Sequence, residues 1–472
     1  MSAPPVFQAL YTSLDEDLTA FNQTIAEHWD GSKYPTLFAA NLFNANADAG
    51  PNLVNAGSVT AIQVQLQQLK AMGVKAVTIE VSFPMLYEPF FASPAQFQQF
   101  VAFYQNLAVS VRAMGLKLIV ENECLLNDPT VDGWNVGPFY AGLSWAEYQA
   151  ARAQTAVTIA QTMLPDYMVV LEEPDTEAAM SGQTEVGTPA GAATLLSAIL
   201  NAVQAAHIPG VLFGAGIGSW LSDYAQFIDN FLALPVDFID MHVLVVNLAF
   251  LPNALAIAQM AAAAGKPIAI TQAWLHKEAD AELNAISNDV VLARNPFSFW
   301  APLDVFFIQT LLSLANYAKL AYLDFFESNY FFAYLPYGPT TENLSPSAIL
   351  AMEGQQANIN MQAGLFTGTA VAYYDAITAG PDTVPPTAPG DLTAGSAQAT
   401  QVYLKWAAST DNIGVAGYRI YRNGVGIATT ANLYYIDSTT AAGTSYSYAV
   451  GAYDLAGNVS KPALVTVATP AG

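Results

Sequence analysis

Short apolar runs alternate with longer stretches of helical periodicity along the first three quarters of the chain. Several of the runs are nearly continuous in Val, Ile, Leu and Phe, which is typical of parallel strands covered on both faces. Eight runs, each 7 or 8 residues long, predict strands at Thr36–Phe43, Ala76–Phe83, Lys117–Cys124, Tyr167–Glu173, Val211–Ile217, Phe238–Val245, Pro267–Trp274 and Ala321–Glu327. Helical patterns between them include Val59–Met72, Ala95–Met114, Trp145–Leu164 and Pro302–Ala318.

Eight strands alternating with helices predict a (β/α)8 barrel with loop insertions over residues 1–380. Gly73, Gly115 and Gly265 follow predicted helices, where a C-terminal cap favours a left-handed residue. A doubly wound open sheet is the alternative. It is less favoured, because no Gly-rich phosphate loop follows the first predicted strand.

The pattern changes near residue 380. Residues 381–386 lie in a Pro-rich stretch that predicts an extended linker. Residues 387–472 show short segments of alternating apolar and polar residues separated by turn signals, which predicts an all-β immunoglobulin-like sandwich. This tail resembles a fibronectin type III domain, and the residues that carry the resemblance are Pro385–Leu392, Leu404–Trp406, Gly417–Arg422, Tyr446–Val450 and Asp454–Ser460. Such domains often follow catalytic domains of secreted bacterial polysaccharide hydrolases, usually as spacers, and Trp406 is expected in the sandwich core.

Composition excludes several classes of protein. Of 472 residues, 53% are hydrophobic and 11% are charged, which excludes global disorder. The net charge of -24 disfavours binding to nucleic acid and to anionic membranes. No apolar run approaches about 18 residues, so no transmembrane helix is expected. Met1–Pro5 shows no signal peptide, although a secreted protein without its leader has the same appearance.

The metal-ligating and nucleophilic residue types form no motif. Cys124 is the single cysteine, so no internal disulfide forms, and its apolar surroundings favour a packing role. The four histidines show no metal-ligand spacing. We therefore expect neither a metal nor a cofactor.

Polar residues gather where the predicted strands end. Barrel enzymes place their functional groups at this end, and buried charges are costly unless they are paired, so the set predicts a polar pocket. Its members are Asn41, Asn44, Glu80, Glu121, Glu123, Glu172, Glu173, Asp240, His242, Gln272, Trp274, Asp324 and Glu327. Glycoside hydrolysis needs two carboxylates across the scissile bond, and strands 4 and 7 of a barrel can supply that separation.

Two short motifs at these strand ends resemble the clan A barrel glycoside hydrolases. That clan carries an acid/base Glu after strand 4, usually as Asn-Glu-Pro, and a nucleophile Glu after strand 7. The resemblance assigns Glu173 of Glu172-Glu173-Pro174 as the acid/base and places Gln272 of Thr271–Trp274 at the nucleophile position. His242 resembles a residue of the clan that contacts the nucleophile or the substrate. The expected function is retaining β-glycosidase action on an oligo- or polysaccharide, outside the cell.

The chain departs from the clan pattern at two positions. Glu172 replaces the usual Asn, and it points to the face opposite Glu173 if the strand continues through both. Gln272 is a neutral amide that cannot form a glycosyl ester, so the chain is expected to be inactive as written. Three explanations stay open: an introduced Glu→Gln change, a naturally non-catalytic sugar-binding barrel, or a displaced nucleophile. Glu327 is the candidate for a displaced nucleophile.

Further residues are expected to contact the sugar. They are Glu172, His242, Trp274, Glu327, Asn41, Glu121, Trp134 and Tyr330.

Two other functions compete with the first. One is substrate-assisted cleavage of an N-acetylhexosaminide by Glu172 and Glu173, although the Asp-x-Asp-x-Glu pattern of chitinases is missing. The other is carbohydrate binding without catalysis. The sugar, the linkage and the oligomeric state are not encoded in any pattern that we can identify.

Overall fold

The structure is a computed structural model that describes residues 3–124, 134–283, 285–378, 383–411, 415–430, 432–454 and 458–471. Parts of the expected linker 381–386, of the loop Asn127–Ser144 and of the stretch Asp454–Ser460 lie outside these residues. The chain forms two compact units. The first comprises Met1–Lys70, Val74–Asn295 and Pro302–Ser328, and the second comprises Ala71–Gly73, Pro296–Ala301 and Asn329–Gly472.

Eight parallel strands close into a barrel in sequential order, which confirms the predicted fold and excludes the open sheet. The strands are β1 (Leu37–Asn41), β2 (Ala76–Glu80), β3 (Lys117–Glu121), β4 (Tyr167–Val169), β5 (Leu212–Gly218), β6 (Phe238–Val243), β7 (Ile268–Ala273) and β8 (Tyr322–Phe325). The barrel interior contains a buried apolar cluster that includes Ile119, Val169, Phe238 and Tyr322. Every strand begins where the sequence predicts it to within a residue, and most end earlier.

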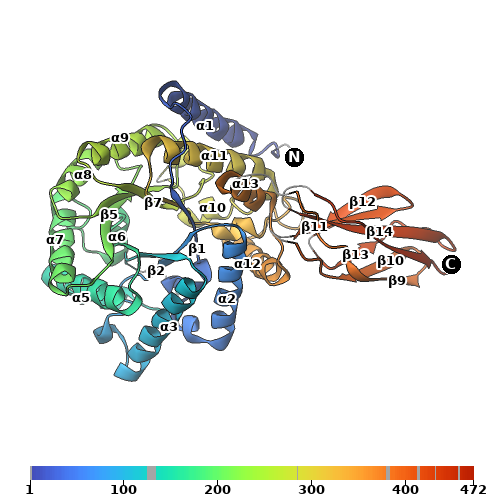
Figure 1. Cartoon of the computed structure of the whole chain (residues 1–472), viewed down its shortest axis with the longest axis horizontal. Helices are drawn as coiled ribbons and strands as arrows, with labels where there is room; N and C mark the ends of the chain where they lie inside the picture. The colour runs from blue at the N-terminus through green and yellow to red at the C-terminus, as the bar shows by residue number, and fades with distance from the viewer. Residues whose placement is uncertain are drawn as a thin grey trace. The chain divides into compact units, whose positions relative to one another are not determined.

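Helices follow the strands and surround them, and Figure 1 shows several in the outer ring, among them α3, α5, α7, α8 and α9. The helices are α1 (Gln8–His28), α2 (Ala56–Ala71), α3 (Pro94–Ala113), α4 (Gly137–Ala141), α5 (Trp145–Met163), α6 (Pro174–Ser181), α7 (Pro189–Ala205), α8 (Tyr224–Leu232), α9 (Phe250–Ala263), α10 (Asn288–Leu292), α11 (Ala301–Ala318), α12 (Pro346–Ala363) and α13 (Gly368–Ile377). Short 3-10 turns are η1 (Phe43–Ala45), η2 (Ala47–Val54), η3 (Glu88–Phe90), η4 (Asp280–Glu282), η5 (Ser298–Trp300) and η6 (Ser328–Phe331).

Local sequence explains where these elements begin and end. Ser144 caps α5 through a capping box with Glu147. Gly73, Gly115 and Gly265 adopt φ of 81°, 74° and 68°, as predicted for residues that end helices. Gly216 in β5 has another role, because a Cβ there would lie 2.3 Å from the Asp240 carbonyl oxygen. A glycine at this position therefore lets β5 approach β6, the strand that carries Asp240 and His242.

One helical segment is apolar and long enough to cross a membrane by length and composition. Among the described residues it is Ser298–Ala318, which contains α11, and 61% of its apolar 18-residue window is buried inside the structure. Burial of that extent is expected of a helix that packs in a protein core.

The tail is an all-β sandwich of the predicted kind. One sheet has the order β13-β10-β9 and the other the order β12-β11-β14-β15. The strands are β9 (Gly390–Gln398), β10 (Gln401–Ala407), β11 (Val415–Arg422), β12 (Val425–Thr430), β13 (Tyr434–Asp437), β14 (Ser445–Asp454) and β15 (Ala463–Ala468). The arrangement of a barrel followed by a fibronectin type III domain is thus confirmed.

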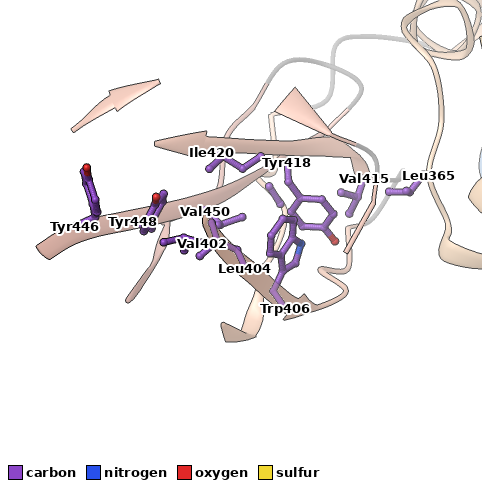
Figure 2. Close-up of a cluster of buried hydrophobic side chains, with 11 residues drawn as sticks. Leu365, Val402, Leu404, Trp406, Val415, Tyr418, Ile420, Tyr446, Tyr448 and Val450 are labelled. Carbon is purple, nitrogen blue, oxygen red and sulfur yellow. The ribbon is translucent and has the colours of Figure 1, made fainter. Parts of the chain in front are cut away.

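Trp406 lies in the core of the sandwich, as expected from the sequence. Its ring packs edge-on against Tyr418 with centroids 5.3 Å apart. Figure 2 shows both rings among the buried side chains of the two sheets. Leu365, which follows α12, belongs to the same buried cluster and pairs with Val415 in an isolated bridge. The core of the sandwich therefore extends beyond the boundary at residue 387 that the sequence suggests.

Candidate active site

The carboxyl ends of the barrel strands bring the predicted polar residues together at two depths. Glu80, Glu173 and Gln272 retain 8%, 8% and 5% of their surface exposed. Below them lies a fully buried set, which consists of Asn41, Glu121, Glu172, Asp240, His242 and Asp324. Parallel pairing accounts for this convergence, because Glu80 is in register with Glu121 and His242 with Gln272. The outer residues can contact a substrate, and the inner residues can contact only what enters below it.

Glu173 lies at the point where the chain leaves the barrel and enters α6. Pro174 is the first residue of that helix, a position that suits its fixed φ. The Glu173 carboxylate accepts hydrogen bonds from His242 Nδ1 at 2.7 Å and from Thr176 Oγ1 at 2.6 Å. Burial raises the pKa of Glu173, but these bonds and the charge on His242 outweigh burial and lower it below its ordinary value. Glu173 is therefore ionised in the resting site.

His242 lies in β6 between carboxylates on both sides of its ring. Its Nδ1 contacts Glu173, while its Nε2 lies 3.8 Å from Glu172 Oε2 and 3.3 Å from Asp240 Oδ2. Burial disfavours the charged ring, but Asp240 and Glu173 outweigh that cost and raise the pKa of His242 well above its usual value. His242 therefore contacts Glu173, the residue that the sequence predicts as the acid/base.

Glu172 is completely buried and faces the same imidazole as Glu173. Neither of its carboxylate oxygens has a hydrogen-bond partner within the described part of the chain. Burial, followed by the charges of Glu121 and Glu123, raises the pKa of Glu172 well above the ordinary value. Opposite faces were expected only if the strand continued through Glu172 and Glu173. Regular β4 ends at Val169, and both carboxylates lie beside His242.

Gln272 is the penultimate residue of β7 and pairs with His242 of β6 in the sheet. Its Nε2 donates a hydrogen bond of 2.5 Å to Glu121 Oε2. The other oxygen of Glu121 has no hydrogen-bond partner among the described residues. Burial is the main reason that the pKa of Glu121 is raised well above its usual range, although His242 and Gln272 oppose it. Gln272 thus contacts the acidic pocket through Glu121.

Two further predicted residues lie at the ends of β1 and β8. Asn41 is buried at the end of β1, where its Oδ1 accepts a hydrogen bond of 3.0 Å from Asn46. Glu327 follows β8, and burial raises its pKa to about 7 against the opposing charge of Lys277. Lys277 forms a buried ion pair with Asp304, so the Glu327 side of the barrel mouth contains both charges.

The three predicted aromatic residues are all packed against other rings. Trp274 is 0% exposed and meets the Phe325 ring edge-on, with centroids 6.2 Å apart. Trp134 lies within 5.2–5.9 Å of three phenylalanine rings, those of Phe90, Phe91 and Phe100. Tyr330 belongs to the second compact unit and stacks on Tyr334. Sugar contacts by these rings stay predictions.

Sequence reasoning placed Glu123 among the strand-end acids but gave it no role. Burial, followed by the charge of Glu173, raises the pKa of Glu123 to about 8, so it is protonated at neutral pH. Its signal was the spacing Glu121-Asn122-Glu123, which puts a second acid just past a strand end. Thr176 was missed entirely, although its position in the first turn of a helix that begins with Pro174 brings it close to Glu173.

A buried ion pair holds the segment that carries Glu172 and Glu173. Arg152 of α5 donates to both carboxylate oxygens of Glu177 in α6, each at 2.9 Å. The same guanidinium donates to Asn122 Oδ1 at 2.7 Å and to the Val170 carbonyl oxygen at 3.2 Å. Arg152 therefore ties the end of β3, the segment after β4 and the start of α6 together.

Three buried side chains could hold a metal ion. One ligand atom each from Glu121, Glu172 and His242 lie within 4.8 Å of one another. These residues come from three positions of the barrel, and no short spacing in the sequence links them. The site as a whole therefore contains an ionised carboxylate, Glu173, and a protonated acid, Glu123, which suit acid–base chemistry on a polar substrate. Beneath them lies the cluster of buried side chains that could bind a metal ion.

Comparison with known proteins gives different results for the two parts of the chain. No family model matches. The chain is 50% identical over 110 residues to an alpha-amylase of Niallia circulans, which covers 23% of this chain and 8% of that protein. It is 49% identical over 80 residues to Chitinase Chi52 of Paenibacillus xylanexedens, covering 17% of this chain and 15% of the other. Exoglucanase B of Cellulomonas fimi is 42% identical over 99 residues, or 21% and 9% of the two chains.

Among solved structures, a Cellulomonas fimi endo-beta-1,4-mannanase double mutant aligns over 97% of this chain and 98% of its own. The two chains are 16% identical and the TM-score is 0.39, a similarity that carries no conclusion about activity. The curated relatives match through their fibronectin type III-like domains, and this chain spans only 8–15% of their length. These relatives thus share the tail with this chain, and the barrel is identified by its own closed topology.

Proposed function

We propose that the chain is a glycoside hydrolase that acts outside the cell on an oligo- or polysaccharide, with Glu173 in its catalytic pair. One observation carries the proposal: Glu173 follows the fourth strand of a closed barrel and is hydrogen-bonded to His242 of the sixth. Glycoside hydrolysis requires carboxyl groups held at the substrate face in different protonation states. Relatives of the tail carry the names alpha-amylase, chitinase and exoglucanase, which agrees with a carbohydrate substrate.

In the first assignment of roles, Glu173 is the acid/base and position 272 is the nucleophile. Gln272 is nearly isosteric with Glu and lies next to His242 in the sheet, but an amide cannot form the glycosyl ester. The chain as written is then inactive, and Gln272→Glu restores the nucleophile. Because residue 272 contacts Glu121 at 2.5 Å, the new pair of carboxyls would share a proton, and the buried Glu121 is the one to keep it.

In the second assignment, Glu123 is the proton donor and Glu173 is the nucleophile or base. It is favoured by the opposite protonation states of the two residues, since the pKa of Glu123 is raised to about 8 while that of Glu173 is lowered. Environments that push two pKa values apart are the mark of an acid and base pair. In this assignment Gln272 orients Glu121 and needs no replacement.

The discriminating experiment measures hydrolysis of aryl glycosides and polysaccharides by the wild type, Gln272→Glu, Glu173→Ala and Glu123→Gln. The first assignment predicts activity only after Gln272→Glu, with a rise of orders of magnitude. The second predicts an active wild type that loses about 10²–10⁴-fold in Glu123→Gln on poor leaving groups and much less on activated aryl glycosides. Gln272→Met is the control for the first outcome. Methionine is about as long as glutamate but has no carboxylate, so it should not restore activity.

Azide rescue of Glu173→Ala, made in the active background, reports the role of Glu173 directly. A glycosyl azide of retained configuration identifies Glu173 as the acid/base, and one of inverted configuration identifies it as the nucleophile.

Absence of hydrolysis by the chain as written and by Gln272→Glu, together with measurable sugar binding, would refute both assignments and favour a carbohydrate-binding barrel. The substrate-assisted alternative is less favoured, because Glu172 is 0% exposed and cannot meet an acetamido group as it lies.

A further inference from the structure

In the buried layer of the barrel mouth, several carboxylate oxygens have no hydrogen-bond donor within the described part of the chain. We propose that Glu121, Glu172 and His242 form a binding site for one divalent first-row metal cation, beneath the outer residues that meet the substrate. This site goes beyond the proposed function and does not rest on it, since a cation can bind there whether or not the barrel cleaves sugars.

The distances within the cluster suit a single ion. The three ligand atoms lie within 4.8 Å of one another. Three atoms at that separation have a common point no more than about 2.8 Å from each, and metal–ligand distances to carboxylate and imidazole are about 2.0–2.2 Å. Each side chain therefore needs to move by less than about 0.8 Å to coordinate one ion.

The hydrogen bond on the other side of His242 prepares the ring for coordination. Nδ1 donates to Glu173 Oε1 at 2.7 Å, so Nε2 is the ring nitrogen that can bind an ion, once it has given up its proton. Metal-bound histidines characteristically donate their second ring nitrogen to a carboxylate in this way, which fixes the tautomer. In the folded chain Nε2 faces the carboxylates of Glu172 and Asp240, at 3.8 and 3.3 Å. A lone pair opposite two carboxylates is unfavourable unless a cation or a proton lies between them.

The carboxylates of the cluster have the free oxygens that a metal requires. Both oxygens of Glu172 are buried and have no hydrogen-bond partner in the described ranges of the chain. One oxygen of Glu121 binds Gln272 Nε2, and the other is also without a hydrogen bond there. Asp240 Oδ2 lies 3.3 Å from His242 Nε2 and its Oδ1 accepts a hydrogen bond from Thr271, so Asp240 is placed to support the site. A buried carboxylate without any donor is costly, and coordination to a cation removes that cost.

The donor set determines the class of cation. Two carboxylates and one imidazole suit Zn²⁺ and Mn²⁺, whereas Mg²⁺ and Ca²⁺ favour sites made of oxygen alone. Both carboxylates are fully buried, so a bound cation would compensate their charge where solvent cannot.

Isothermal titration calorimetry of the whole chain, first freed of metal with a chelator, tests the site. Zn²⁺ and Mn²⁺ are titrated separately. We expect one ion per chain and a melting temperature that rises with ion concentration, since a ligand of the folded state stabilises it. Ca²⁺ is expected to bind at least tenfold more weakly. Equal affinity for Ca²⁺ would rule out ligation by the imidazole.

Matched variants locate the ion. Glu172→Gln removes a ligand charge at constant shape, and His242→Asn removes Nε2 but keeps an amide nitrogen near the place of Nδ1. Each should weaken binding at least tenfold. Glu80→Gln is the control, because Glu80 is another buried carboxyl of the mouth whose Oε1 already accepts a hydrogen bond from Asn46 at 3.0 Å. Circular dichroism and melting without metal establish that each variant is folded.

Stoichiometric binding that is lost in Glu172→Gln and in His242→Asn, and kept in Glu80→Gln, supports the site. Binding unchanged in the first two variants would place the ion elsewhere and overturn the proposal, as would no heat and no shift in melting with either metal. Because the readout is binding, a failure here is independent of any failure to detect hydrolysis.

Discussion

At the scale of single residues, His242 links the two layers of the pocket. One ring nitrogen bonds the outer residue Glu173, and the other faces the buried residues Glu172 and Asp240. Any change at Nε2, by proton or cation, alters the charge that stabilises ionised Glu173. On the proposed function, His242 is a positioning residue for Glu173, and the contacts that suggest this role have no counterpart in the spacing of the sequence.

A second residue, Asp437 in the sandwich, allows a prediction on pH. Its Oδ2 accepts hydrogen bonds from Tyr448 at 2.6 Å and Arg422 at 2.8 Å, and its Oδ1 accepts one from the Thr439 backbone at 2.9 Å. Burial raises the pKa of Asp437, but these partners outweigh it and lower the pKa below the ordinary value. A carboxyl with a lowered folded pKa contributes stability above its unfolded pKa of about 3.9 and loses it as pH falls further.

Asp437→Asn should therefore destabilise the sandwich by about 1–3 kcal/mol at pH 7 and by clearly less at pH 3. Pulse proteolysis of the full chain in urea measures this difference. The intact sandwich is quantified at each urea concentration through a peptide from β14. A cost that is the same at both pH values would show that the charge of Asp437 does not matter. Asp391→Asn, at an exposed position of the same domain, is the control.

At the scale of elements, the segment after β4 is held by α5 in addition to two backbone hydrogen bonds with β5, from Val170 N to Gly214 O at 2.9 Å and from Gly216 N to Leu171 O at 2.8 Å. Arg152 is 0% exposed and bridges Glu177, Asn122 and the Val170 carbonyl. Arg152→Met should lower the free energy of unfolding by about 3–5 kcal/mol, because Glu177 is left as a buried charge without its cation. Arg152→Met with Glu177→Gln should recover part of the loss.

Urea unfolding of the three proteins measures these differences. Arg152→Lys should fall between wild type and Arg152→Met, because an ammonium keeps the charge but not the bidentate geometry. An Arg152→Met chain within 1 kcal/mol of wild type would contradict the assigned role of the ion pair. The same variants should also change activity, because the segment carries Glu173.

The hydrophobic pattern predicts strand positions well and strand ends poorly, for a physical reason. Apolar runs report burial, and burial continues where the regular pairing of a strand has ended. Leu171 is 0% exposed, although β4 ends at Val169 and the segment beyond it keeps two backbone hydrogen bonds to β5. The rule that strand ends meet at one face predicts that Glu173 and His242 come together. It could not predict the orientation of Glu172, which depends on where the alternation stops, nor the packing of Trp134 against Phe90, which has no periodicity to reveal it.

At the scale of the whole molecule, acidic residues outnumber basic ones by 38 to 14, and the excess extends into the interior. Among the described residues, His242 is the histidine that lies within 4 Å of the buried carboxyls of the barrel mouth. Lys277 and Arg152, which are also buried, are committed to Asp304 and Glu177. The mouth therefore relies on protons or on an external cation for neutrality, and this links the composition of the chain to the metal site proposed above.

The last prediction concerns the boundary between the barrel and the tail. Residues 384–472 include all strands of the sandwich, whose core is built from its own two sheets, so their deletion should leave the barrel folded and any hydrolytic activity within a few-fold. The cut is not clean, because Leu365 belongs to the sandwich core and loses its contact with Val415. We expect the truncated chain to stay soluble and to melt a few degrees lower, and Leu365→Ser in the truncated chain should restore solubility if the exposed leucine causes aggregation. Circular dichroism melting and hydrolysis assays measure both effects. Loss of all soluble protein in both truncated chains would show that the sandwich is required for the barrel to fold.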